Sequence, residues 1–222
     1  MDGVVYSISK VLMNTALKIF GELYLEGKEN VPKSGPFIVV SNHLSNLDPA
    51  LLMASLPRRV YFLAKKRLFA YPIASSFFRA YGAFPVETDG GSFPALRWAK
   101  KRLAENRGMA IFPEAHRKPK GGIGSPLSGV SLLGRVTQAP IVPVGITGSE
   151  HIGPFWRVAF PTGKYSVKIG EPFILPAIPD KKLDRSILDP GLRESFLDSS
   201  TDMIMNRVAS LLPKQYRGIY DS

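Results

Sequence analysis

Short apolar runs alternate with helical patterns along most of this 222-residue chain. The runs are typical of buried strands and lie at 36–40, 60–64, 82–86, 109–112, 141–144 and 165–169. Apolar residues at helical spacing fill most of the intervals, at 50–56, 68–81, 92–106, 130–138 and 201–212. This alternation predicts an α/β fold with a largely parallel sheet flanked by helices. No internal repeat or interdomain linker interrupts it, so we expect a single domain.

The N-terminal residues 4–23 predict a helix that is apolar on most of its sides. Only a narrow stripe of Ser7, Lys10, Asn14 and Lys18 is polar. Such a helix is either covered by protein or dips into lipid, and the residues leave both options open. In the second case the two lysine stems could reach headgroup phosphates. We divide the chain into an N-terminal amphipathic, membrane-facing helical segment at 1–28 and an α/β domain at 29–222.

Composition restricts the partners and the chemistry. The net charge of +11 favours an anionic partner: nucleic acid, acidic lipid headgroups, or a negatively charged carrier or cofactor. The positive charge is spread along the chain, and the sequence contains no recognisable nucleic-acid-binding motif. We therefore expect no nucleic acid as partner. The chain has no cysteine, which excludes disulfides, thiolate nucleophiles and cysteine-bound zinc.

No stretch reaches the roughly 18–20 uninterrupted apolar residues of a spanning helix. The N-terminus does not fit a signal peptide either, because Asp2 replaces a basic region and Lys10 and Lys18 interrupt the apolar run. We therefore expect a peripheral or monotopic protein on the cytoplasmic face of the cell membrane.

His43 is the first candidate for chemistry, because it lies just after a predicted strand. In open α/β sheets, ligands and catalytic groups lie at the carboxyl ends of the strands. Asp48 follows five residues later, near enough for its carboxylate to fix the imidazole tautomer and leave the other nitrogen to accept a proton. The pair lacks only a nucleophile, which the acceptor's own hydroxyl can supply. Taken alone, this spacing favours the plainer interpretation of a helix start at Asp48 beside an ordinary loop histidine.

A second strand-end loop places Glu114 and Arg117 after the strand at 109–112. A guanidinium is suited to binding phosphate or carboxylate, and a nearby acid can orient it. A surface ion pair is the plainer alternative for these two residues. His116 and His151 show no partner pattern and are left outside the predicted site.

The two loops together resemble the glycerolipid acyltransferase family, which includes bacterial 1-acylglycerol-3-phosphate acyltransferases. The family's first block is similar to Asn42-His43 with Asp48, and its third block is similar to Phe112–Arg117. Further similar segments are Gly82–Thr88 for the second block, Ile141–Gly145 for the fourth, and Ala64-Lys65-Lys66. The resemblance covers roughly residues 35–148, in the family's order and spacing.

The resemblance implies an O-acyltransferase of phospholipid biosynthesis that acylates a lysophosphatidic-acid-like hydroxyl. The donor would be acyl-CoA or acyl carrier protein, with no metal and no further cofactor, and membrane lipids would be partners. His43, held by Asp48, would be the general base. Asn42, Lys65, Glu114 and Arg117 would contribute to substrate binding, and backbone N–H groups near Gly145 are candidates for the oxyanion contact.

Three departures from the family pattern fall on the acceptor side. Thr88 stands where an arginine is usual, Ala115-His116 replace Gly-Thr, and Pro126–Ser128 replace a Phe-Lys pair before Gly129. Two cationic contacts are therefore missing, which predicts either a different lysolipid or polyol acceptor or a phosphate held by other residues such as Arg67.

Three other functions remain open on the sequence. The His–Asp pair could activate water in an ester or thioester hydrolase, although no Gly-x-Ser-x-Gly elbow is present. The chain could also be a basic membrane-binding module, or a family member without activity.

Overall fold

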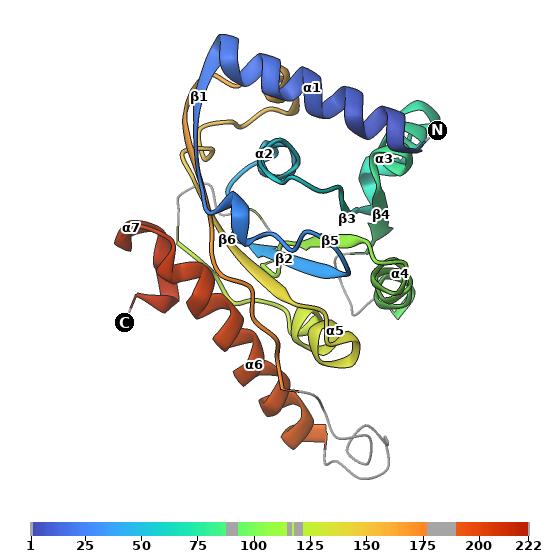
Figure 1. Ribbon diagram of the computed structural model, residues 1–222, viewed down its shortest axis with the longest axis vertical. Coiled ribbons are helices and arrows are strands. Elements are labelled where there is room, and N and C mark those ends of the chain that lie inside the picture. Colours follow the sequence, from blue (N-terminus) through green and yellow to red (C-terminus); the bar gives the residue numbers. More distant parts are fainter. Residues whose placement is uncertain (1, 88–92, 115–116, 118–121, 177–189, 222) are drawn as a thin grey trace.

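A seven-stranded sheet forms the centre of the computed structural model, with helices on both of its faces (Figure 1). The structure describes residues 2–87, 93–114, 117, 122–176 and 190–221, without the side chains of residues 2 and 190–195. The strands are β1 (Gly21–Glu26), β2 (Phe37–Ser41), β3 (Val60–Lys65), β4 (Ala83–Val86), β5 (Gly108–Ile111), β6 (Ile141–Thr147) and β7 (Gly163–Ile169).

The strand order is β1-β7-β6-β2-β5-β3-β4. Strands β2, β3, β4, β5 and β6 run parallel, whereas β7 pairs antiparallel with β6 and parallel with β1. The predicted α/β class and largely parallel sheet are confirmed. Five strands thus present their carboxyl ends at one edge, and that edge positions the site.

The helices divide into two layers that bury separate apolar clusters. Helices α1 (Asp2–Phe20), α2 (Asp48–Ser55) and α3 (Pro72–Tyr81) cover one face, and α4 (Phe93–Ala104), α5 (Gly129–Thr137) and α6 (Pro190–Ser210) cover the other (Figure 1). Strand residues alternate between the layers: Phe37 and Val39 face the first cluster, and Ile38 and Val40 face the second. Short elements complete the chain: η1 (Lys28–Asn30), η2 (Lys66–Phe69), η3 (Phe155–Ala159), α7 (Lys214–Arg217) and η5 (Gly218–Tyr220).

The N-terminal segment differs from the prediction of a helix over 4–23. The helix ends at Phe20, and residues 21–26 form β1 at the edge of the sheet. The sequence of β1 alternates in burial, with Leu23 and Leu25 half-buried and the residues between them exposed. Its glutamates face lysines on β7, with Lys164 Nζ 3.1 Å from Glu22 Oε2 and Lys168 Nζ 3.2 Å from Glu26 Oε2. This period of two identifies a strand, and the charged rows protect the sheet edge from further pairing.

Helix α1 is buried on one side only. Tyr6, Met13 and Leu17 are buried in the first cluster, so the helix packs on the protein. Lys10 Nζ donates to the Leu56 carbonyl at 2.5 Å, and burial lowers the pKa of this ammonium, with nearby Lys28 adding to the effect. Lys10 therefore points inward and is not placed to reach headgroups, whereas Lys18 is exposed. No helix within the described ranges combines the length and apolarity needed to span a bilayer.

We predict that Gly108→Ala destabilises the fold by about 1–3 kcal/mol through overpacking. Gly108 pairs with Phe37, and a Cβ on it would lie 2.4 Å from Cζ of that fully buried ring. Urea unfolding followed by circular dichroism measures the loss. Gly129→Ala is the matched control, because a Cβ there meets nothing within 4 Å. An equal loss in both variants would refute the packing argument.

Candidate active site

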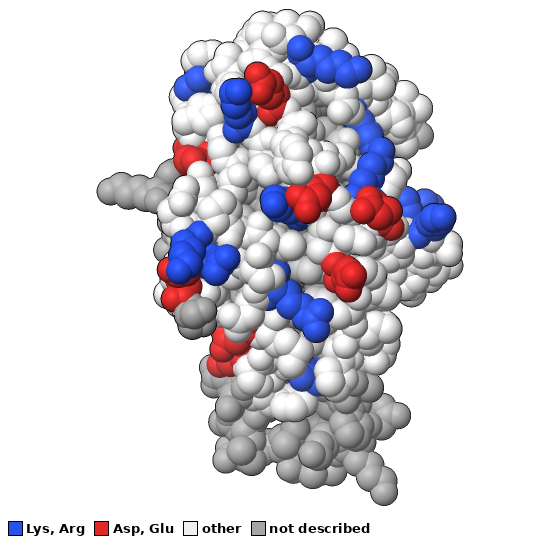
Figure 2. All heavy atoms as spheres, turned by 60° about the vertical axis from the view of Figure 1, so that its left-hand side comes forward, with Lys and Arg blue, Asp and Glu red and all other residues white. Residues whose placement is uncertain are grey.

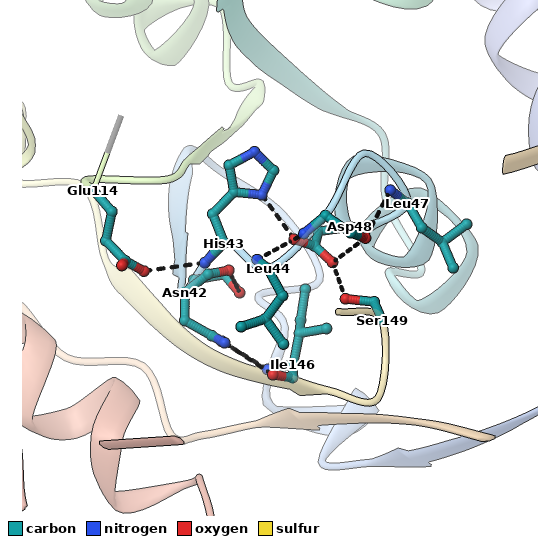
Figure 3. Close-up of polar contacts among 10 residues, drawn as sticks. Asn42, His43, Leu44, Leu47, Asp48, Glu114, Ile146 and Ser149 are labelled. Carbon is teal, nitrogen blue, oxygen red and sulfur yellow. Dashed lines mark hydrogen bonds and ion pairs between the residues drawn. The ribbon is translucent and has the colours of Figure 1, made fainter. Parts of the chain in front are cut away.

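The buried carboxylate of Asp48 organises the loop after β2. Asp48 is fully buried at the first residue of α2, where backbone N–H groups are unpaired within the helix and favour a negative charge. Its Oδ2 accepts hydrogen bonds from the backbone N–H groups of Leu44 at 2.6 Å and Ser45 at 2.8 Å. Its Oδ1 accepts from the hydroxyls of Ser45 and Ser149. The loop is thereby held against the helix start and against the segment that follows β6 (Figure 3).

The imidazole of His43 stands on this carboxylate, with Nδ1 2.7 Å from Asp48 Oδ2. A carboxylate only accepts hydrogen bonds, so Nδ1 carries the proton and Nε2 presents its lone pair. Figure 3 shows only one ring nitrogen directed at Asp48, while the rest of the ring extends away from it. The ring also stacks on Phe112 at 4.3 Å, and its side chain keeps 17% of its surface exposed. This geometry suits a general base, because Asp48 orients the ring through Nδ1 while part of the side chain remains accessible.

Two further polar side chains, those of Asn42 and Glu114, hold the backbone around His43. Asn42 exchanges two hydrogen bonds with the main chain of Ile146, Nδ2 to O at 2.9 Å and N to Oδ1 at 2.8 Å. Glu114 Oε1 accepts from the His43 backbone N–H at 3.1 Å, and Oε2 accepts from Gly124 N–H at 3.0 Å. Both were predicted to contribute to substrate binding. The structure places them as supports of the loop that carries His43.

A pocket of about 650 Å³ opens beside His43 and is lined by Leu44 and Ser45. Four cationic side chains also line it, namely Lys65, Lys66, Arg67 and Arg117, together with the carboxylates of Glu87 and Glu150. Lys66 Nζ lies 2.5 Å from Glu87 Oε1, and this hydrogen bond raises the pKa of the lysine. The pocket therefore has a cationic lining suited to a phosphate or another anion. Thr88, Ala115 and His116, which make up two of the three departures noted above, lie outside the described residues.

The structure places Gly145 in a closely packed part of the sheet. The residue lies inside β6, between β2 and β7, and a Cβ on it would lie 2.9 Å from Leu212 Cδ2 and 3.0 Å from Leu211 Cβ. Both leucines lie just after α6. Close packing against them accounts for this glycine, and the nearby Ile146 N–H is already paired with Asn42.

Sequence reasoning missed several residues that contact the site from other parts of the chain. Ser149, which contacts Asp48, follows β6 at the same sheet edge, and that position was the available signal. Tyr216 of α7 donates to Glu150 Oε1 at 2.6 Å, and burial together with this bond raises the tyrosine pKa to about 12. His151, left outside the predicted site, has Nε2 2.6 Å from the Thr162 carbonyl and stacks on Tyr165.

The C-terminal residues support the loop that holds Glu114. Ile219 N–H donates to the Ile123 carbonyl at 3.3 Å, and Gly218 packs so closely on Ile123 that any Cβ would meet its backbone at 2.4 Å. Burial raises the pKa of Tyr220, as do its hydrogen bond to Asp202 and the nearby charge of Glu114. The C-terminal residues thus pack on the loop whose Gly124 N–H donates to Glu114. Among the side chains that the structure describes, no three His, Cys, Asp or Glu residues are grouped as metal ligands would be.

Comparison with known proteins then identifies the family. The profile of the family described as Acyltransferase matches residues 22–147, which hold every strand end that forms this site. The chain belongs to this acyltransferase family. The predicted resemblance and enzyme class are thereby confirmed.

Individual relatives extend the comparison beyond the family profile. The 1-acyl-sn-glycerol-3-phosphate acyltransferase of Bacillus subtilis is 27% identical over 169 residues, which is 75% of this chain and 81% of that protein. A chloroplastic enzyme of the same name from Arabidopsis thaliana is 29% identical over 66% of this chain and 42% of its own length. The crystal structure of the 1-acyl-sn-glycerophosphate acyltransferase from Thermotoga maritima has a TM-score of 0.69 at 27% identity, covering 95% of this chain and 80% of that one.

We predict that Asp48→Ala lowers the free energy of unfolding by about 2–5 kcal/mol, because it leaves the buried N–H groups of Leu44 and Ser45 without an acceptor. His43→Ala removes one contact of a partly exposed ring and is expected to cost clearly less. Urea unfolding of both variants tests the difference. Equal destabilisation would show that the hydrogen bonds that Asp48 accepts from the backbone of Leu44 and Ser45 add nothing to stability beyond its contact with His43.

Proposed function

We propose that this acyltransferase moves a fatty acyl group from acyl-CoA or acyl carrier protein to the free hydroxyl of 1-acyl-sn-glycerol-3-phosphate. The observation that carries the proposal is the His43–Asp48 pair beside a cationic pocket, in a chain of this family. Relatives named for this acceptor occur in bacteria, plants and animals. No additional cofactor takes part in the proposed step.

The transfer proceeds in two proton-coupled stages. Nε2 of His43 takes the hydroxyl proton as the oxygen attacks the thioester carbonyl, and the imidazolium that forms is stabilised by Asp48. The tetrahedral intermediate then collapses, the carbon–sulfur bond breaks, and the proton passes from His43 to the leaving thiolate. The enzyme supplies no nucleophile of its own, because the acceptor oxygen forms the new ester directly.

Phosphate binding is the proposed role of the pocket's cations. Lys65 and Arg67 line the pocket from the end of β3 and from η2, and Arg117 lines it from the loop after β5. Each guanidinium can contact two phosphate oxygens at once. Lys66 is engaged with Glu87 in an exposed ion pair. This arrangement supports the second of the two predicted explanations for Thr88, in which other basic residues hold the acceptor's phosphate.

Charge and apolar surface together support a location at the membrane. Lys and Arg are dispersed over the face in Figure 2 among acidic residues, unlike the continuous basic stripe expected of a nucleic-acid binder. Helix α1 exposes Val4, Ile8, Val11, Leu12 and Ile19, each at 54–67%. We infer that the outer side of α1 binds peripherally to the cytoplasmic side of the cell membrane.

We predict that Val11→Ser combined with Leu12→Ser weakens flotation of the protein with phosphatidylglycerol-containing vesicles. Unchanged flotation would contradict membrane binding through α1. A truncation of 1–24 is unsuitable, because it would remove most of β1.

We predict that His43→Ala lowers kcat/KM for acyl transfer by about 10²–10⁴-fold, the contribution of a positioned general base. Transfer from labelled acyl-CoA and from acyl carrier protein to lysophosphatidic acid measures it. His151→Ala is the matched control, because its contacts are to Thr162 and Tyr165. Release of free fatty acid by the native chain without any acceptor would instead indicate a hydrolase.

We predict that Arg67→Ala and Arg117→Ala each raise KM for lysophosphatidic acid by about 10–100-fold, the loss expected for a charge-assisted hydrogen bond. Monoacylglycerol lacks the phosphate, so its turnover should be unaffected by either variant. Arg97→Ala, an exposed arginine on α4, is the control. Equal effects on both acceptors would remove the phosphate role from these residues, and wild-type preference for another lysolipid would show a different acceptor.

A further inference from the structure

Two segments that follow pocket-lining residues in the chain carry exposed apolar side chains, in addition to the outer face of α1. Tyr71, just before α3, is 76% exposed, and Ile73 and Phe77 within α3 are 88% and 45% exposed. The segment around η3 exposes Phe155, Trp156 and Phe160 at 56%, 66% and 51%. We call these six residues the aromatic rim. Surface clusters of this kind are uncommon on soluble monomers and indicate a binding surface.

Ring contacts connect the two halves of the rim and join them to α1. Phe155 meets Phe78 at 6.4 Å between ring centroids, and Phe78 meets Phe77 at 5.5 Å. At the other end, Phe160 packs edge-on against Phe20 at the end of α1, at 5.4 Å. The rim is therefore continuous with the helix whose outer face carries the exposed aliphatic residues.

The rim also borders the pocket through the chain itself. Ile152 and Gly153 line the pocket, and Phe155 follows two residues after Gly153. Lys66 and Arg67 also line the pocket, and they lead through η2 to Tyr71. The Asn46 amide donates to the Gly153 carbonyl at 3.1 Å, which ties the η3 side to the loop of His43. Apolar surface thus begins where the cationic pocket ends.

We propose that the aromatic rim inserts into the bilayer interface, so that the acceptor presents its phosphate to the pocket while its acyl chain stays in the membrane. Tyr and Trp are enriched at membrane interfaces, because an apolar ring with a polar edge suits the headgroup level. Exposed Lys66 and Arg67 beside the rim complement anionic headgroups. The occupant is therefore a lipid surface, and the proposal rests on the proposed function, whose acceptor is itself a lipid.

This arrangement removes a barrier to catalysis by a protein that meets the membrane at its surface. A long acyl chain leaves the bilayer for water only at a large free-energy cost. A rim that reaches the interface lets the headgroup enter the pocket without exposing the chain.

The two tryptophans allow a direct test of insertion. Trp156 is exposed on the rim, whereas Trp98 stacks on Phe84 in the opposite layer. In Trp98→Phe, phosphatidylcholine–phosphatidylglycerol vesicles should shift the Trp156 emission to the blue, and lipids brominated on the acyl chain should quench it. In the matched Trp156→Phe variant, the emission of Trp98 should be unaffected. Vesicle binding without a shift or quenching of Trp156 would overturn the proposal. A blue shift that depends on protein concentration without lipid would identify a second copy as occupant and would overturn it equally.

A second measurement separates the rim from the proposed reaction. Phe155→Ser with Trp156→Ser should lower transfer to long-chain lysophosphatidic acid in vesicles by about tenfold or more, as expected from losing two aromatic side chains that insert into the membrane. Turnover of a short-chain, monomeric lysophosphatidic acid with short-chain acyl-CoA should stay at the wild-type level. Ile174→Ser is the control, because Ile174 is 57% exposed beside Phe173, which bridges to the amino-terminal residue of β6.

The outcomes distinguish the two proposals. Equal losses on vesicle-bound and monomeric acceptors would overturn the rim and leave the acyl transfer standing. No turnover of either acceptor by the wild-type chain would overturn the proposed function, while quenching of Trp156 would still report on insertion.

Discussion

The fully buried carboxylate of Asp48 is the interaction on which the site depends. A charge in the interior is tolerated only when donors surround it, and here two backbone N–H groups, two serine hydroxyls and an imidazole do so. These donors come from the β2–α2 loop and from Ser149 after β6. The same bonds that satisfy the carboxylate therefore fix the tautomer and direction of His43. Structure and proposed chemistry share one set of contacts.

The parallel sheet explains why residues distant in sequence meet at this point. The five parallel strands end at one edge, where Lys65 is the last residue of β3 and the loops after the other strands carry His43, Glu87, Glu114 and Ser149. The layer on the far side of the sheet contributes indirectly. The C-terminal residues pack on the loop at 122–124, this loop donates to Glu114, and Glu114 holds the backbone of His43.

The surface around the pocket is divided by polarity in a way that matches an amphiphilic ligand. Lys65, Arg67 and Arg117 supply positive charge within the pocket, and the aromatic rim and α1 supply apolar surface beside it. Helix α1 is covered by protein on one side, which is the first of the two alternatives that the sequence left open. Its inner side chains complete the core, and its outer side chains remain exposed. A net charge of +11 adds a long-range attraction to anionic surfaces. At short range, the separate cationic and apolar regions would orient the protein on such a surface.

The sequence by itself determined the α/β class, most of the strands, the family resemblance and the pairing partner of His43, because these depend on hydrophobic period and on short spacings within one loop. It did not separate β1 from the preceding helix, since Leu23 also lies at helical spacing from Ile19 and Phe20. Tertiary structure alone decided that Asn42 and Glu114 support the histidine loop, that Gly145 is a packing position, and that Ser149 and Tyr216 contact the site. These contacts join residues as far as 104 positions apart; they follow from how strands are ordered in a sheet, and no local pattern encodes that order.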